Sequence, residues 1–457
     1  MRIVAVSLCV LCVMLCDCTV AAELSAGTAR VDLTPPLEWR VPLGGYGARM
    51  SRPATGVHDR VFAKALVLSE GDRRFGLVTA DVLAFPPPFK QAVLDRLGEG
   101  WSAEQLMLLP SHSHTSLDMS SLNPANTYEI PQIGMFHPQV FAATVERVAG
   151  VVEEAASQTQ PVCVGTDSRK ISGWNRNRRS SEGVVDDGLI VTRFDGLDGL
   201  PVAVLVNFAA HPTFLSDREM MFSAGWPGHL QRTMEAVIGE GVTVMYYNGA
   251  EGDQSPVARA DSGASRWERA ERYGRELGLL SCELWRTIET RRDVVFSHHR
   301  QPIALPEQTW HRDYLETGGK EYGLTEELLT RLLPALFPRE TASVSVWIGD
   351  LVIAGVPGEM TAELGAGDQA TGPRDFRCRA RGDRRAGGRM GQLHSQQCGV
   401  CEGRVRGERE FLRAGPGGDD RRRGRGGDAS TRSLTAEEQP ATRRPVRAPA
   451  WHGIASR

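Results

Sequence analysis

The 457-residue chain is poor in cysteine and lacks long apolar runs. It has nine cysteines, four of them within the first 18 residues, which is too few for a disulfide framework even in an oxidising compartment. No apolar stretch is long enough to cross a bilayer core about 30 Å thick, which excludes a multi-span membrane protein. The hydrophobic share of 41% and the charged share of 24% are those of an ordinary globular protein, so global disorder and collagen are excluded as well.

The net charge of −3 conceals a strong asymmetry along the chain. Residues 365–457 hold 20 arginines, no lysine and 11 acidic residues, a balance of +9 that leaves −12 on residues 1–364. The segment 366–457 has no apolar periodicity and is rich in glycine and arginine. One interpretation is a disordered basic tail. The other, which we favour, is that this segment is an out-of-frame translation of a GC-rich gene, because the change in composition falls inside an expected helix.

The first 22 residues have the pattern of a secretory signal peptide. Arg2 supplies the positive charge, Ile3–Leu15 is a short apolar segment, and Val20-Ala21-Ala22 offers small residues for cleavage after Ala22. An uncleaved anchor or a buried N-terminal helix is the alternative. We therefore expect a secreted or periplasmic protein.

Between these ends, apolar runs alternate with helical patterns. The predicted strands are 61–68, 75–83, 105–110, 201–208, 242–247 and 343–356, the last with Gly349-Asp350 as a hairpin turn. The predicted helices are 138–157, 227–239 and 265–287. Continuous apolar strands between helices are typical of buried strands, so we predict the α/β class: a layered, mixed α/β catalytic domain with site loops at the ends of its strands. No internal repeat is visible.

Two of the apolar runs end in histidines. His112 and His114 follow the run at 105–110, and at positions i and i+2 of an extended segment they point to the same face. His211 follows the run at 201–208. Imidazole is a common zinc ligand, and sites form at the carboxyl ends of strands in open α/β sheets, so these three side chains are candidate ligands. Each histidine taken alone also fits an ordinary surface or core position.

Two further polar clusters follow apolar runs. Residues 248–256 read Asn-Gly-Ala-Glu-Gly-Asp-Gln-Ser-Pro, a glycine-bearing loop that can expose Ser255 beside backbone N–H groups able to bind an oxyanion. The spacing is not that of a nucleophile elbow, and a plain surface turn fits it as well. Glu359 begins a helical pattern after the run at 343–356, where a carboxylate either caps the helix or serves as an oxygen ligand for a metal.

Taken in order, these segments resemble the neutral/alkaline non-lysosomal ceramidase family in its N-terminal catalytic domain. The resemblance covers roughly residues 25–365 and depends on the ordered set rather than on one motif. The matching segments are Asp32-Leu33-Thr34-Pro35-Pro36, Gly44-Gly45-Tyr46-Gly47, Gly56-Val57-His58-Asp59, Thr79-Ala80-Asp81, His112-Ser113-His114, Asn177-Arg178-Arg179, Asn207 to Pro212, Asn248 to Pro256 and Pro357-Gly358-Glu359. It implies a zinc-dependent hydrolase domain over residues 23–365 that cleaves an N-acyl amide bond.

The resemblance also implies roles for single residues. Three of the family's four protein ligands to zinc have counterparts here: His112, His211 and Glu359. His114 would line the pocket and hydrogen-bond the substrate or the metal-bound water. Ser255 matches a serine that acts as nucleophile or positioning group. Arg178 is the best match for an arginine that contacts the substrate or its oxyanion.

The chain departs from the family pattern at three places. His114 is followed by Thr115-Ser116-Leu117-Asp118 instead of a glycine-rich sequence, so the wall of the lipid pocket is altered. No tyrosine follows Tyr322, so the fourth ligand is missing. Residues 366–457 do not show the C-terminal β-sandwich of full-length members.

We therefore predict a zinc-dependent hydrolase that resembles neutral ceramidase, which splits N-acylsphingosine into sphingosine and fatty acid, and that uses metal-activated water or Ser255. Two alternatives stay open: a metal-dependent amidase or esterase acting on a smaller, non-lipid substrate, and a catalytically dead homologue acting as a binding protein. The expected partner is a small-molecule or lipid N-acyl substrate, together with a peripheral contact to a membrane surface. No nucleic-acid partner is expected.

Overall fold

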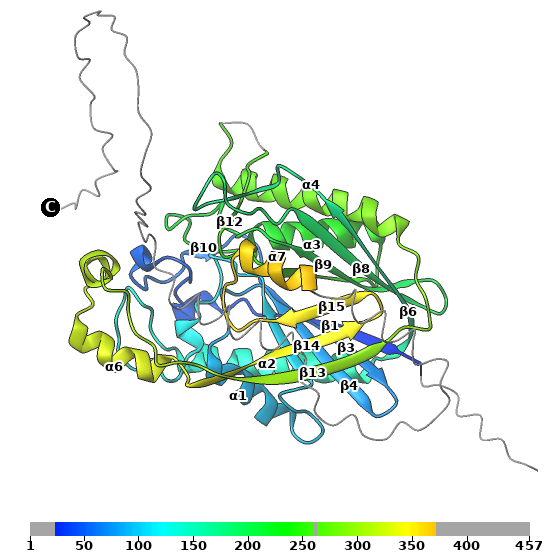
Figure 1. Cartoon of the computed structure of the whole chain (residues 1–457), viewed down its shortest axis with the longest axis horizontal. Helices are drawn as coiled ribbons and strands as arrows, with labels where there is room; N and C mark the ends of the chain where they lie inside the picture. Colours follow the sequence, from blue (N-terminus) through cyan, green and yellow to red (C-terminus); the bar gives the residue numbers. More distant parts are fainter. Residues whose placement is uncertain (1–22, 260–262, 372–457) are drawn as a thin grey trace, which may run out of the picture. The chain divides into compact units, whose positions relative to one another are not determined.

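The computed structural model describes residues 23–259 and 263–371 (Figure 1). The predicted signal peptide, residues 1–22, lies outside the described residues. So does most of the predicted tail, 366–457, except that the helix α7 (Ala362–Thr371) continues across its first residues. Strands and helices together confirm the predicted α/β class.

A sheet of eight strands forms the centre of the fold, in the order β11-β9-β8-β6-β1-β3-β4-β5. The strands are β1 Ser25–Asp32, β3 Phe62–Glu70, β4 Arg73–Ala80, β5 Leu106–Pro110, β6 Gln160–Lys170, β8 Gly188–Gly196, β9 Pro201–Phe208 and β11 Thr243–Asn248. The outermost pairs, β4 with β5 and β9 with β11, are parallel, and the pairs between them are antiparallel. The sheet is therefore mixed, with parallel pairs at its two edges and antiparallel pairs between them.

The two halves of the sheet share one connectivity, although the sequence shows no repeat. Each half has three successive antiparallel strands, a helix, a strand parallel to the last one, and a second helix. The helices are α1 Pro87–Leu97 and α2 Pro138–Ser157 in the first half, and α3 Gly225–Ile238 and α4 Arg266–Thr287 in the second. Because each parallel pair directs its carboxyl ends to one place, each half provides one set of site loops.

The sheet folds over between β6 and β1, where only two residue pairs are in register, so that its halves stack face to face. Alternate residues of β3 show the layers: Val67 faces α1 and α2, whereas Leu68 faces the second half of the sheet, including Leu205 of β9. The side-chain Nζ of Lys64 crosses between the halves and donates to the carbonyl of Val244 at 2.7 Å. With α1 and α2 below and α3 and α4 above, Figure 1 shows four layers.

A separate three-stranded sheet completes the inner core. Its strands are β13 Phe296–Ala304, β14 Glu340–Ile348 and β15 Leu351–Gly355, and apolar residues of all three join the cluster between the stacked halves. Gly349 lies in the predicted turn between β14 and β15 with a φ of 60°, a conformation that glycine adopts without strain. This sheet matters for the site because β15 leads directly to Glu359.

The remaining elements are short. They are the strands β2 Gly56–Val57, β7 Asn175–Asn177, β10 Met221–Phe222 and β12 Gln254–Pro256, the helices α5 Lys320–Tyr322 and α6 Glu326–Leu336, the 3-10 turns Leu37–Trp39, Gly47–Arg49 and Ser120–Leu122, and the π-helical turn Leu315–Gly319. Strand β10 pairs with β2, and β12 pairs with β7. Within the described ranges, no helix is long and apolar enough to cross a membrane.

Candidate metal centre

His112 lies just beyond the carboxyl end of β5. The backbone N–H of the preceding Ser111 donates to the carbonyl of Ala80, which extends the pairing of β5 with β4. His112 then takes a left-handed backbone conformation with a φ of 61°, so the prediction that an extended i, i+2 spacing aligns the two histidines is wrong in its geometry. Its Nδ1 donates to the carbonyl of Leu83 at 2.8 Å, which leaves Nε2 free to bind a metal.

His211 lies beyond the carboxyl end of β9, in the other half of the sheet. Its backbone N–H donates to the carbonyl of Gln254 at 3.0 Å, and its side chain is 2% exposed. Nδ1 lies 3.0 Å from the carbonyl oxygen and 2.6 Å from the carboxylate of Glu251. Burial lowers the pKa of His211, but the hydrogen bond and charge of Glu251 outweigh this effect and the net shift is upward. Its Nε2, like that of His112, faces the centre.

His114 completes a group of three buried imidazoles. Its ring lies 4.9 Å from the ring of His112 and 5.4 Å from that of His211, and both of its nitrogens are buried without a hydrogen-bond partner in the described part of the chain. Burial lowers the pKa of His114 well below 6.5, and the neighbouring His112 and His211 lower it further. His114 is therefore neutral, with a free nitrogen lone pair.

Glu359 brings a carboxylate to the same centre. One of its oxygens lies 3.2 Å from Nε2 of His112 and the other 3.7 Å from Nε2 of His211. Ligand atoms that surround a tetrahedral zinc ion at about 2.0–2.2 Å are separated by about 3.3–3.6 Å. Ligand atoms of the three histidines all lie within 4.8 Å of one another. The residues therefore fit a metal ion.

The other predicted residues lie on neighbouring loops. Ser255 is on β12, opposite Arg176 of β7, and no hydrogen bond joins it to the three histidines among the residues described. Arg178 donates from its backbone N–H to the carbonyl of Asp253 and from its guanidinium to the carbonyl of Gly252, both at 2.7 Å. Its charge contributes to the lowered pKa of His114, which places Arg178 within electrostatic reach of the centre. The roles of Ser255 and Arg178 stay predictions.

Sequence reasoning missed two residues that shape the centre. Glu251 was part of a quoted motif, but nothing in the sequence indicated that its carboxylate is buried behind His211. Arg49 is 1% exposed, and its guanidinium donates to four backbone carbonyls, including that of His114. The other three acceptors are the carbonyls of Gly44, Ser216 and Glu219. Arg49 thus connects three loops around the site through hydrogen bonds. Its position after Gly-Tyr-Gly-Ala in the sequence gave no indication of this role.

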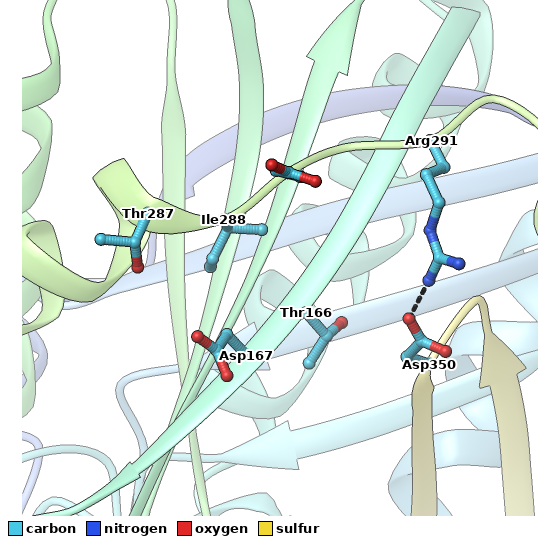
Figure 2. Close-up of a pocket in the computed structure, with 7 residues that line it drawn as sticks. Thr166, Asp167, Thr287, Ile288, Arg291 and Asp350 are labelled. Carbon is cyan, nitrogen blue, oxygen red and sulfur yellow. Dashed lines mark hydrogen bonds and ion pairs between the residues drawn. The ribbon is translucent and has the colours of Figure 1, made fainter.

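A pocket elsewhere on the molecule shares no residue with this centre (Figure 2). It is lined by Thr166, Asp167, Thr287, Ile288, Glu289, Arg291 and Asp350. Figure 2 shows Arg291 paired with Asp350 across its edge. Since it lacks histidine, the pocket offers none of the chemistry of the candidate centre.

The buried histidines and the carboxylate form a group that could hold a metal ion at the carboxyl ends of sheet strands. The chain belongs to the neutral/alkaline non-lysosomal ceramidase family, whose N-terminal profile matches residues 24–260. The predicted resemblance is thereby confirmed.

Individual relatives agree with this assignment. The chain is 26% identical over 215 residues to the neutral ceramidase of Mycobacterium tuberculosis (strain ATCC 25618 / H37Rv), across 42% of this chain and 33% of that protein. Its fold is similar to the crystal structure of neutral ceramidase from Pseudomonas aeruginosa, with a TM-score of 0.65 and 18% identity over 76% of this chain and 64% of that one. A structure of a ceramidase complexed with C2 gives a TM-score of 0.63 at 18% identity, over 76% and 65% of the two chains. The chain thus spans about a third of the length of this curated relative from Mycobacterium tuberculosis.

Proposed function

We propose that this protein is a zinc-dependent hydrolase that cleaves the N-acyl amide bond of a ceramide-like lipid. The observation that carries the proposal is the placement of Glu359 oxygens 3.2 and 3.7 Å from the free Nε2 atoms of two buried histidines. Membership in the ceramidase family supports the substrate class. A zinc ion bound here would polarise the amide carbonyl and lower the pKa of a bound water towards about 7.

The surrounding residues prepare the site for this chemistry. The carbonyl of Leu83 accepts from Nδ1 of His112, and the backbone carbonyl of Glu251 lies 3.0 Å from Nδ1 of His211. Both rings are thereby held with Nε2 towards Glu359, where each nitrogen binds a metal in its deprotonated form. His114 stays neutral at physiological pH, so it can donate one hydrogen bond and accept another from the substrate. Arg178 carries a positive charge at the edge of the centre and is suited to stabilise an oxyanion. Ser255 would serve as nucleophile or positioning group from β12.

The test is hydrolysis of N-acylsphingosine by the purified chain, measured before and after removal of metal with a chelator. We expect activity to be lost on chelation, restored by Zn²⁺, and reduced at least about 100-fold by His112→Ala, because one ligand of the ion is gone. A rate that neither chelation nor His112→Ala changes would contradict the proposal. Short-chain N-acyl amines serve as the second substrate class, since the loop after His114 departs from the family; a preference for them would favour the non-lipid alternative.

A further inference from the structure

The carboxylate of Glu251 is buried directly behind His211. Glu251 as a whole residue is 5% exposed, and one of its carboxylate oxygens lies 2.6 Å from Nδ1 of His211. The backbone carbonyl of the same glutamate lies 3.0 Å from that nitrogen and also accepts from the backbone N–H of Gln254 at 2.8 Å. Gln254 in turn accepts from the backbone of His211. These hydrogen bonds fix the ring of His211 and the backbone of Glu251. The carboxylate oxygen beside the ring is a close charge contact and has no hydrogen-bond partner of its own in the described part of the chain.

The charge of Glu251 has no cationic partner other than this ring. Among residues 23–259 and 263–371, no lysine or arginine forms an ion pair with it. Besides His211 it faces the buried Tyr246, whose pKa is raised first by burial and then by the charge of Glu251. A buried carboxylate without a compensating positive charge is strongly unfavourable. A cation on the opposite nitrogen of the His211 ring would supply that compensation through the imidazole.

The two histidines that face Glu359 are therefore not equivalent. His112 has only a neutral carbonyl, that of Leu83, behind its Nδ1, whereas His211 has a neutral carbonyl and, in addition, a carboxylate oxygen 2.6 Å away. A carboxylate behind a ligand histidine fixes the ring and its tautomer and makes Nε2 a stronger electron donor than a carbonyl does.

We propose that Glu251 is a positioning residue that tunes His211 as the stronger metal-binding histidine of the centre. This inference rests on the metal site of the proposed function and adds a residue outside the ligand set Glu359, His112 and His211. The carboxylate does not touch the ion; it acts through the imidazole, by orientation and by charge.

The test compares Glu251→Gln with Glu251→Asp in the purified full chain. Glutamine keeps the size of the side chain and a hydrogen-bond acceptor but removes the charge, whereas aspartate keeps the charge on a shorter side chain. We expect Zn²⁺ affinity, measured by competition with a chromophoric chelator, to fall about 10- to 100-fold in Glu251→Gln and by less in Glu251→Asp. The visible absorption of the Co²⁺-loaded protein, which reports ligand field, should shift in Glu251→Gln.

Asp195→Asn is the matched control, because Asp195 is also 5% exposed but pairs with Arg193 at the opposite end of the strand pair that leads to His211. Its Zn²⁺ affinity should stay within about twofold of the parent, as expected for a site without shared partners. If Glu251→Gln binds Zn²⁺ as tightly as the parent and gives the same Co²⁺ spectrum, the inference is wrong. An equal loss of affinity in Asp195→Asn would also overturn it, because the effect would then be one of general destabilisation.

One outcome separates this inference from the proposed function. A parent chain that binds Zn²⁺ tightly but hydrolyses no amide removes the proposed function and leaves the role of Glu251 testable by affinity alone. Should Glu251→Gln be unstable, the rise in melting temperature on adding Zn²⁺ replaces the titration. A rise equal to that of the parent contradicts the role of Glu251, and a smaller rise supports it.

Discussion

At the scale of single residues, the direction of each imidazole is set by a different neighbour. His112 is held by the carbonyl of Leu83, and His211 by Glu251. His114 has no such hydrogen bond; its ring is confined by the edge of Tyr46, 4.9 Å away, and by the backbone of Gly45. Packing rather than hydrogen bonding therefore positions the one histidine that is free to reach a substrate.

Gly45 tests this confinement. It has a φ of +91°, and a Cβ placed there would lie 2.5 Å from the ring of His114. We expect Gly45→Ala to lower the free energy of unfolding by about 3 kcal/mol, of which about 1–2 kcal/mol is backbone strain and the rest the clash. Gly173→Ala is the control, since Gly173 has a φ of +83° but open space around it. Urea unfolding of both variants measures the difference, and equal losses would show that the ring of His114 is not confined by this contact.

At the scale of elements, helices α3 and α4 are joined by an unusually close approach. Gly274 of α4 faces the backbone of α3, where a Cβ would lie 2.2 Å from the carbonyl oxygen of Trp226. Helix α4 is also well defined at its start, since Ser265 and Glu268 form a capping box. Because α3 packs on β11 and follows the loop that carries His211, this contact supports the second half of the site.

A pair of glycine-to-alanine changes measures the helix contact. Gly274→Ala should destabilise the protein by about 3 kcal/mol, because the backbones of α3 and α4 must separate to admit a methyl group. Gly150→Ala on the exposed face of α2, where a Cβ meets nothing within 4 Å, should instead stabilise by about 0.5–1 kcal/mol. Thermal unfolding of the two variants tests this, and a neutral Gly274→Ala would show that the two helices can separate freely.

At the scale of the whole described molecule, the site exists only because two similar halves stack. His112 comes from the first half and His211 from the second, and neither half alone holds both. The ends of the two parallel pairs are tied together where the Asn248 side chain donates to the carbonyl of Ser111 at 2.9 Å. A second tie is the buried pair of Lys64 on β3 and Glu235 on α3, 2.6 Å apart.

The Lys64–Glu235 pair gives a test of how firmly the halves are joined. Its side chains are 6% and 16% exposed, so Lys64→Met leaves the largely buried Glu235 carboxylate with only the exposed Arg30, 3.8 Å away, as a cationic partner. We expect this variant to lose about 3 kcal/mol of stability, the lower end of the range for a broken buried pair because Arg30 remains, and the double variant Lys64→Met/Glu235→Leu to lose less than Lys64→Met alone. Denaturant unfolding of the full cycle is the measurement. A double variant as unstable as the sum of the two single variants would show that the residues do not act as a pair.

Local sequence patterns predicted most of the elements that carry the site. The helix expected at 138–157 is α2 without correction, and the strand at 201–208 is β9. These segments were predictable because their apolar residues repeat with the period of the element and are bounded by proline, glycine or polar residues. The shared connectivity of the two halves of the sheet was not predictable in this way, because two segments can have the same order of strands and helices without similar amino-acid sequences.

The sequence by itself determined which chemical groups are available: three histidines and a glutamate, each placed after an apolar run that forms a strand. It also determined the α/β class, since periodicity is a local property. Only the tertiary structure decided that His211 joins His112 and that Glu251 and Arg49 are buried beside them. Those facts depend on how a folded-over sheet brings distant strand ends together, and burial and charge compensation arise only when residues far apart in sequence exclude water from the same place.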